Sequence, residues 1–289
     1  MAIVSVENLK MSYDKGRVKA LKGVTFDVEE GEIFGLIGPD GAGKTSLFRI
    51  LTTLLLADSG KAVVDGMDVV NDYKKIRQHI GYMPGRFSLY QDLTVEENLS
   101  FFATVFNTTI EENYHLVEDI YRQIEPFKKR KAGKLSGGMK QKLALSCALI
   151  HAPHVLFLDE PTTGVDPVSR KEFWEMLQKL KKNFKLSIVV STPYMDEALQ
   201  CDRIALIQDG QFLTIDTPEN IIRTYTQTLW SLRSDKMHKL LTDLRGIDGV
   251  KTAFAFGENH HATIDTSVLT VDSLRNRLVS LGHRNIVIE

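Results

Sequence analysis

The feature that most constrains this chain is a glycine-rich run, residues 38–45, between an apolar segment and a helical pattern. Residues 33–37 are apolar, and Leu47, Ile50 and Leu51 begin a helix-period stripe. Glycines let successive backbone N–H groups turn toward an anion, and a helix N-terminus adds partial positive charge. The run fits the phosphate-loop pattern. Its members are Gly38, Pro39, Asp40, Gly41, Ala42, Gly43, Lys44 and Thr45.

Each polar group in this run has an expected role. We expect Lys44 to reach the β- and γ-phosphates of a nucleotide and Thr45 to hold Mg²⁺, with Ser46 completing the site. The alternative is a plain glycine-rich turn before a helix. The strand–loop–helix context favours the phosphate site.

Composition limits the remaining choices. The chain has 289 residues with a formal net charge of −1, so we expect no general attraction to nucleic acid. Its two cysteines, Cys147 and Cys201, are far apart and are expected to be buried, reduced thiols. The first residues resemble a strand, not a signal peptide, and no apolar run approaches the ~18 residues of a membrane span. Any membrane role is therefore expected to act through a partner.

The first 222 residues are expected to form an α/β domain. Buried strands are predicted at 33–37 and 155–158, further strands at 186–191 and 203–208, and another strand ends at residues 81–84. Helices are predicted after Lys44, within 92–129 and over 168–182, so the main sheet should be mostly parallel. Residues 3–9 and 24–28 are expected to be edge strands, and Asp65-Gly66 a turn.

The last part of the chain, residues 223–289, has its own order of elements. Strands are expected at 229–233, 250–256, 261–265 and 286–288, with helices near 237–244 and 271–281 and a turn at Gly257-Glu258-Asn259. This strand-helix-strand-strand-helix-strand order is typical of a small ferredoxin-like α+β domain. The alternative is that these strands extend the main sheet.

Two further motifs carry chemistry. Asp159 and Glu160 follow a buried strand, where nucleotide hydrolases place a carboxylate that steadies Mg²⁺ and a second one that activates water. Ser136 precedes Gly137 and Gly138 at the start of a helical pattern, which predicts a capped N-terminus able to receive an anion. One chain with one phosphate loop needs no second phosphate site, so this one is expected to serve another molecule's nucleotide.

Together these motifs resemble a known family. GPDGAGKT, LSGGMKQ and VLFLDEP, in this order and spacing, resemble the ATPase domain of ATP-binding-cassette (ABC) transporters over residues 1–222, with a helical subdomain at about 86–150. The resemblance implies a P-loop NTPase fold, ATP and Mg²⁺ as ligands, Lys44 and Glu160 in catalysis, and Thr45 and Asp159 at the metal. It also implies that Tyr13 stacks on adenine.

The resemblance also implies partners. In this family two ATPase domains meet head to tail, so Ser136, Gly137 and Gly138 would contact the partner's nucleotide, and Gly164-Val165-Asp166 matches the loop that pairs the subunits. A transmembrane permease subunit would place the chain at the cytoplasmic face of the membrane. The tail domain is similar to an extension found in some bacterial exporter ATPases.

Two positions depart from the family pattern. Gly85 stands where the family usually has a glutamine that touches Mg²⁺ and the attacking water, and Pro193 stands where it has a histidine that contacts the γ-phosphate. Neither residue can donate a side-chain hydrogen bond, and loss of one such donor typically costs about 10²–10³ in rate. We therefore expect binding to survive and hydrolysis at this chain's own site to be weak.

An impaired site favours an asymmetric pair. In a heterodimer with an intact ATPase, this chain's Ser136 loop would complete the competent site, as in the first half of some tandem-ATPase bacterial exporters. The alternatives are a homodimer with slow turnover by Glu160, a nucleotide-binding regulatory subunit with negligible hydrolysis, and a soluble ABC protein of DNA repair or translation.

Overall fold

The computed structural model describes residues 2–224, 228–256 and 258–289. The chain folds into two units, Met1–Ile221 and Ile222–Glu289, and the division lies one residue before the boundary expected from the sequence. Helix α8 (Pro218–Thr224) crosses this division. In the described residues no helix is long and apolar enough to cross a membrane.

The larger unit is built on a mostly parallel sheet. Its strand order is β10-β9-β3-β8-β7-β6, with β3, β6, β7, β8 and β9 parallel and β10 antiparallel to β9. All residues of the central strands β3, β7 and β8 are buried, as expected for strands covered on both faces. The bounds are β3 (Ile33–Ile37), β6 (Ile80–Met83), β7 (Val155–Asp159), β8 (Ser187–Thr192), β9 (Arg203–Gln208) and β10 (Gln211–Asp216).

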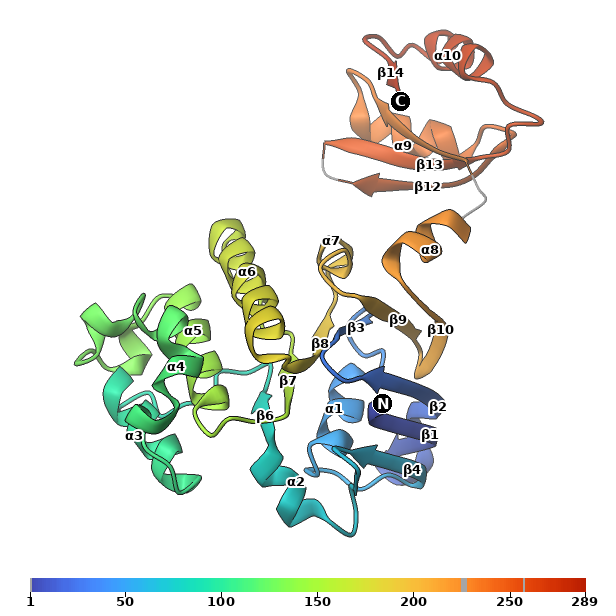
Figure 1. Cartoon of the computed structure of the whole chain (residues 1–289). Coiled ribbons are helices and arrows are strands. Elements are labelled where there is room, and N and C mark those ends of the chain that lie inside the picture. Colours follow the sequence, from blue (N-terminus) through green and yellow to red (C-terminus); the bar gives the residue numbers. More distant parts are fainter. Residues whose placement is uncertain (1, 225–227, 257) are drawn as a thin grey trace. The chain divides into compact units, whose positions relative to one another are not determined.

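Helices cover one face of this sheet more heavily than the other (Figure 1). Leu156, Leu158 and Val190 point into a core shared with α3–α6, whereas Phe157 and Val189 point into a core shared with α1 and the N-terminal strands. The bounds are α1 (Lys44–Leu51), α2 (Tyr73–His79), α3 (Val95–Val105), α4 (Ile110–Tyr121), α5 (Gly137–Leu149), α6 (Pro167–Phe184) and α7 (Met195–Ala198). Helices α3 and α4 each begin with a capping box, at Thr94 and Thr109.

The N-terminal strands form a separate antiparallel sheet in the order β2-β1-β4-β5. The expectation of edge strands at 3–9 and 24–28 is therefore wrong for the first of them, because β1 has β2 on one side and β4 on the other. A single sequence does not reveal this, since β2, β3 and α1 all intervene between β1 and β4. The bounds are β1 (Ala2–Tyr13), β2 (Val18–Glu29), β4 (Ser59–Val64) and β5 (Met67–Asp68).

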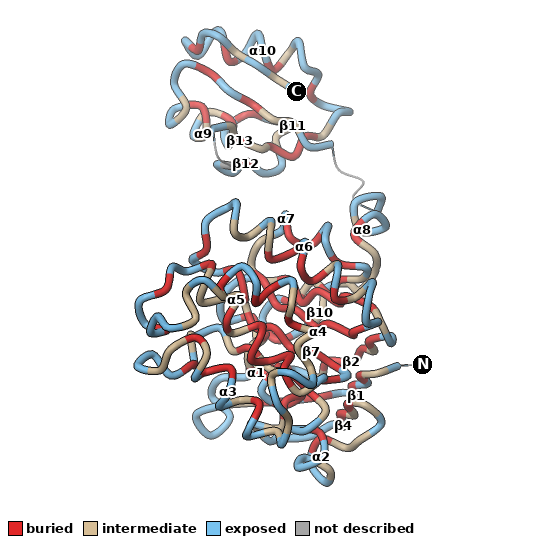
Figure 2. Tube along the Cα trace, turned by 60° about the vertical axis from the view of Figure 1, so that its left-hand side comes forward, coloured by how far each residue is buried: buried red, intermediate tan, exposed pale blue. Residues whose placement is uncertain are grey.

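The smaller unit has the strand-helix-strand-strand-helix-strand order, with an antiparallel sheet ordered β12-β13-β11-β14. This sheet is separate from the main one, and Leu232, Leu240 and Leu274 belong to its own core. In Figure 2 buried residues (red) are concentrated in the interior of the larger unit, and the smaller unit has buried segments of its own. Of the expected turn 257–259, Gly257 lies outside the described residues. The bounds are β11 (Thr228–Arg233), α9 (Met237–Arg245), β12 (Val250–Phe256), β13 (Asn259–Ile264), α10 (Val271–Ser280) and β14 (Val287–Ile288).

Candidate nucleotide-binding site

The glycine-rich run forms the loop between β3 and α1. Gly43 precedes the helix with φ 105°, which L side chains rarely adopt, and an added Cβ there would lie 2.3 Å from Ala20 O. The first helical bond runs from Leu47 N to Gly43 O. The N–H groups of residues 44–46 consequently have no partner within the helix and are oriented to receive an anion.

Lys44 is held at the centre of this loop. Its side chain is 3 % exposed, and Nζ donates to Gly38 O over 2.8 Å and to Pro39 O over 3.0 Å. Nζ also lies 3.1 Å from Glu160 Oε1. The ammonium group is thus positioned by the loop and paired with a carboxylate at the end of β7, at the place where a phosphate would need a cation.

Asp159 and Glu160 are positioned by a residue that sequence reasoning did not single out. Ser191 Oγ donates to Asp159 Oδ1 over 2.7 Å and accepts from Glu160 N over 3.1 Å. Glu160 N also donates to Ser191 O, and Glu160 has φ 51°, which bends the chain as it leaves β7. The sequence signal that could have identified Ser191 is its position as a polar residue at the end of an apolar strand.

The donor set fits Mg²⁺, which prefers oxygen ligands and retains water. In the described residues Asp159 Oδ2 accepts no hydrogen bond, so it is available to an ion or its water, and Thr45 at the start of α1 supplies a hydroxyl. Asp159 also acts on Tyr82. Burial, and then the charge of Asp159, raises the pKa of Tyr82 to about 12.

Tyr13, the last residue of β1, lies beside the same helix. Its hydroxyl and Ser46 Oγ are 3.0 Å apart, and the residue is 36 % exposed. This contact links the tyrosine to the first turn of α1. A partly exposed aromatic ring at the edge of a phosphate loop can stack on a base.

The loop formed by Ser136, Gly137 and Gly138, which we call the Ser136 loop, is partly exposed to solvent. Ser136 and Gly137 are exposed, and Ser136 Oγ accepts from Met139 N over 3.4 Å at the start of α5. Gly138 is buried against Ser169 in α6, where an added Cβ would lie 2.7 Å from Ser169 Oγ. Among the described residues, no hydrogen bond joins this loop to residues 38–45.

Comparison with known proteins decides the family. A sequence model described as "ABC transporter" matches residues 21–163. The probable multidrug ABC transporter ATP-binding protein YbhF of Escherichia coli is 42% identical over 221 residues, which is 75% of this chain and 38% of YbhF. The doxorubicin resistance ATP-binding protein DrrA of Mycobacterium tuberculosis is 33% identical over 280 residues, which is 95% of this chain and 80% of DrrA. The chain belongs to the ABC transporter family.

A solved ABC cassette supports the same fold. The dimeric ATP-binding cassette MJ0796, in a post-hydrolysis state with ADP and phosphate, aligns with a TM-score of 0.67 at 26% identity. The alignment covers 74% of this chain and 98% of that chain. By contrast, this chain spans only about two fifths of the length of YbhF. ABC ATPases bind and hydrolyse ATP, generally with Mg²⁺, and ABC ATP-binding subunits generally dimerise and pair with transmembrane permease components.

Of the two departures from the ABC pattern, Gly85 lies beside Asp159, and Pro193 follows the strand that holds the Asp159–Glu160 pair. A Cβ added to Gly85 would lie 3.0 Å from Asp159 O and 3.9 Å from Asp159 Oδ2, so a side chain at this position starts next to the carboxylate. Pro193 directly follows β8, whose Ser191 holds both acidic residues. Thr192 O accepts from Gly38 N over 3.3 Å, which ties this strand end to the phosphate loop.

Gly85 also lines a cleft of about 400 Å³ between β6 and the helices α3 and α5. Most of its lining is apolar and includes Phe87, Val105 and Ala144. The loop that leaves Gly85 is anchored at its far end by Asn98, which is fully buried in α3 and bonds Tyr90 N, Tyr90 O, Leu93 O and Thr94 O.

Proposed function

We propose that this chain is the ATP-binding subunit of a bacterial ABC exporter and acts on a separate transmembrane subunit. The observation that carries the proposal is the convergence of Lys44, Glu160 and Asp159 at the phosphate loop. Names of relatives such as YbhF and DrrA support export of drug-like molecules as the class of transport. The chain acts as a peripheral subunit at the cytoplasmic face of the membrane.

Each residue of the site has a defined task. The N–H groups of the glycine-rich loop and Lys44 bind the phosphates, Tyr13 stacks on adenine, and Thr45 and Asp159 orient Mg²⁺ directly or through water. Glu160 accepts the proton of the attacking water. Ser191 keeps Asp159 and Glu160 in register, because one hydroxyl bonds to both residues.

The site binds ATP more readily than it hydrolyses it. Gly85 and Pro193 carry no side-chain donor, although both lie next to groups that hold the site together. Loss of one preorganised donor typically costs about 10²–10³ in rate. Glu160 sustains slow turnover, because its carboxylate is present and lies at the phosphate loop, 3.1 Å from Lys44 Nζ.

The partner ATPase carries the competent site. Exposed Ser136 and Gly137 at the N-terminus of α5 face outward, as a surface that completes a second subunit's nucleotide site requires. We therefore favour a heterodimer over a homodimer. A transmembrane subunit inserts a helix into the cleft beside Gly85, where the apolar lining and the proximity to Asp159 support coupling.

Binding of ATP to the purified chain tests the site. Wild type should bind ATP with Mg²⁺, and Lys44→Ala should weaken binding at least tenfold, whereas Lys171→Ala, an exposed lysine on α6, should leave it unchanged. Failure of wild type to bind ATP would overturn the proposal.

Co-purification tests the partners. The chain should be extracted from membranes with a multi-span protein and with a second ATPase that retains the glutamine and histidine. Recovery as a soluble homodimer with turnover typical of intact cassettes would contradict the asymmetric pair. Recovery with both partners but no ATP turnover in any combination would favour the regulatory alternative.

A further inference from the structure

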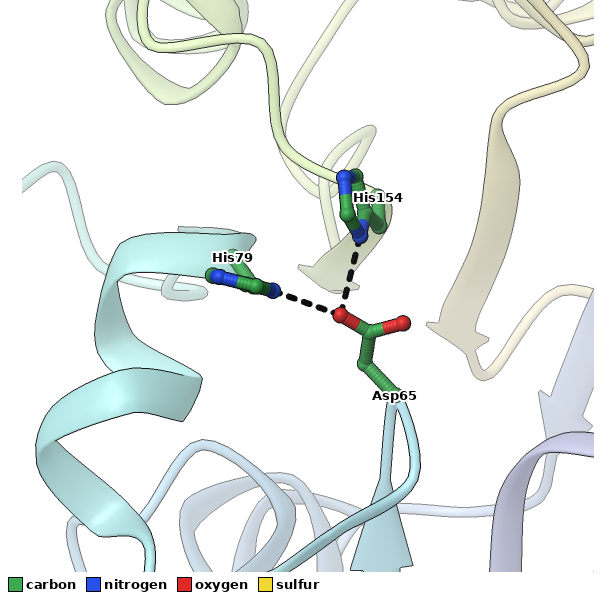
Figure 3. A group of neighbouring side chains, drawn as sticks. All are labelled: Asp65, His79 and His154. Carbon is green, nitrogen blue, oxygen red and sulfur yellow. Dashed lines mark hydrogen bonds and ion pairs between the residues drawn. The ribbon is translucent and has the colours of Figure 1, made fainter.

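A cluster of two imidazoles and one carboxylate lies away from the nucleotide site. His79 Nδ1 and His154 Nδ1 lie 2.6 and 2.9 Å from the same oxygen, Asp65 Oδ2 (Figure 3). The three ligand atoms lie within 4.8 Å of one another. Asp65 is 18 % exposed, and His79 and His154 are 40 and 59 % exposed, so the group is reachable from solvent.

The fold itself brings these side chains together. His79 is the residue before β6 and His154 is the residue before β7, and the two strands start side by side with Ile80 paired to Val155. His154 N donates to His79 O over 2.8 Å, which fixes the two backbones. Asp65 is presented by the turn between β4 and β5 with φ 52°.

This donor set is suited to a transition metal. Imidazole nitrogens with a carboxylate bind Zn²⁺ and its first-row neighbours. Ligands about 2.0–2.2 Å from a tetrahedral ion lie roughly 3.3–3.5 Å apart. The two Nδ1–Oδ2 distances are slightly shorter, so side-chain adjustments of about an ångström would admit the ion, with water as the fourth ligand.

We propose that Asp65, His79 and His154 form a binding site for a divalent transition ion, Zn²⁺ in the first instance. Each imidazole would bind the ion through Nδ1, so a neutral ring must carry its proton on Nε2, and the ion would replace the two Nδ1 contacts with Asp65 Oδ2. The carboxylate of Asp65 already faces both rings, because one of its oxygens contacts Nδ1 of each histidine.

The ion has a structural role. It would join the antiparallel sheet, through Asp65, to the starts of β6 and β7 in the parallel sheet. The opposite ends of these strands are Met83 and Asp159, about 13 and 17 Å from His79 and His154 at roughly 3.3 Å per residue, and Gly85 follows Met83 by two residues. The ion would therefore hold together the N-terminal ends of β6 and β7, at the opposite ends of these strands from the nucleotide site.

Zinc titration of the full, tag-free chain tests the proposal. Calorimetry should give one Zn²⁺ site in wild type, and Co²⁺ should produce the absorption of a low-coordinate N/O site. His154→Ala should weaken Zn²⁺ binding by at least 10–100-fold, the range for loss of groups that merely support ligands. His238→Ala, which removes an exposed histidine from the smaller unit, should leave binding unchanged.

Thermal unfolding provides a second readout that does not depend on activity. Zn²⁺ should raise the unfolding temperature of wild type and of His238→Ala, and should not raise that of His154→Ala or Asp65→Asn. Equal Zn²⁺ affinity in wild type and His154→Ala would overturn the proposal, and so would failure of wild type to bind Zn²⁺ or Co²⁺.

Discussion

The hydroxyl of Ser191 donates a hydrogen bond to Asp159 Oδ1 over 2.7 Å, and both residues are almost fully buried. The same hydroxyl accepts from Glu160 N. One side chain on β8 thus fixes the C-terminal end of β7, where we expect the metal ion and the attacking water to bind.

Ser191→Ala should therefore destabilise the fold and the site together. Loss of a buried bond to a charged group should lower the free energy of unfolding by about 1.5–3 kcal/mol. Ser146→Ala is the matched control, because Ser146 is equally buried and its hydroxyl bonds, within the part of the chain that the structure describes, to the uncharged Lys142 O; it should cost about 1 kcal/mol. Denaturant unfolding measures both, and equal losses would contradict the special role of Ser191.

Gly85→Gln combined with Pro193→His should raise ATP turnover at least tenfold, because it restores the two side-chain donors that the family pattern has at these positions. The new Cβ at 85 starts 3.0 Å from Asp159 O, so the loop must shift by a few tenths of an ångström. Gly85→Ala with Pro193→Ala controls for backbone effects and should give no gain. Steady-state phosphate release measures turnover in both variants. Unchanged turnover in the first variant would count against the match of residues 85 and 193 to the glutamine and histidine of the family pattern.

Tyr13→Ala should weaken ATP binding by about 5–150-fold, which corresponds to a stacking energy of about 1–3 kcal/mol. Tyr13→Phe keeps the ring and loses only the hydroxyl contact with Ser46 Oγ, so it should bind nearly as well as wild type. Fluorescent-nucleotide titration measures both. A Phe variant as weak as the Ala variant would assign the effect to the hydroxyl and reject stacking.

Ser136→Ala should lower ATP turnover of a co-expressed pair while leaving this chain's own ATP affinity unchanged, because Ser136 is proposed to serve the partner's nucleotide. Its cap on α5 is long, at 3.4 Å, so the stability loss should be smaller than for Asp166→Ala, whose cap on α6 spans 3.0 Å. If Ser136→Ala weakens ATP binding to the isolated chain, the assignment fails.

Alkaline stability should depend on Tyr82. Its pKa is raised from 10.0 to about 12, so the folded state holds the phenol proton more tightly than the unfolded chain does. This contribution is complete below pH 10 and is lost as the pH rises through 12. Tyr82→Phe should therefore flatten the decline of unfolding free energy over that interval, whereas Tyr90→Phe, at an exposed position, should not.

Local signals predicted much of the fold. The spacing of residues 38–45 predicted the strand–loop–helix at β3 and α1, and the apolar runs predicted β7, β8 and β9 because parallel strands buried on both faces carry continuous apolar sequence. The roles given to Lys44, Asp159 and Ser136 remain predictions, since their chemistry has not been measured.

The pairing of strands that are far apart in the chain could not be predicted from the sequence. The register that places β4 beside β1, and the pairing of Ile80 with Val155 that brings His79 to His154, depend on contacts between distant segments. The sequence marks Ser191 only as a polar residue at the end of an apolar strand. Its two bonds to Asp159 and Glu160 exist because β7 and β8 are neighbours in the sheet.

The buried amide of Asn98 gives the loop after Gly85 an unusual mechanical character. Four hydrogen bonds from one side chain hold the loop's far end, at Tyr90, Leu93 and Thr94, to α3, so this end of the loop should move together with the helix. A small rotation of the helical layer would accordingly be transmitted along the loop as displacement at Gly85, next to the carbonyl of Asp159. Because Gly85 has no side chain, such a displacement would reach Asp159 through backbone atoms and not through a glutamine side chain.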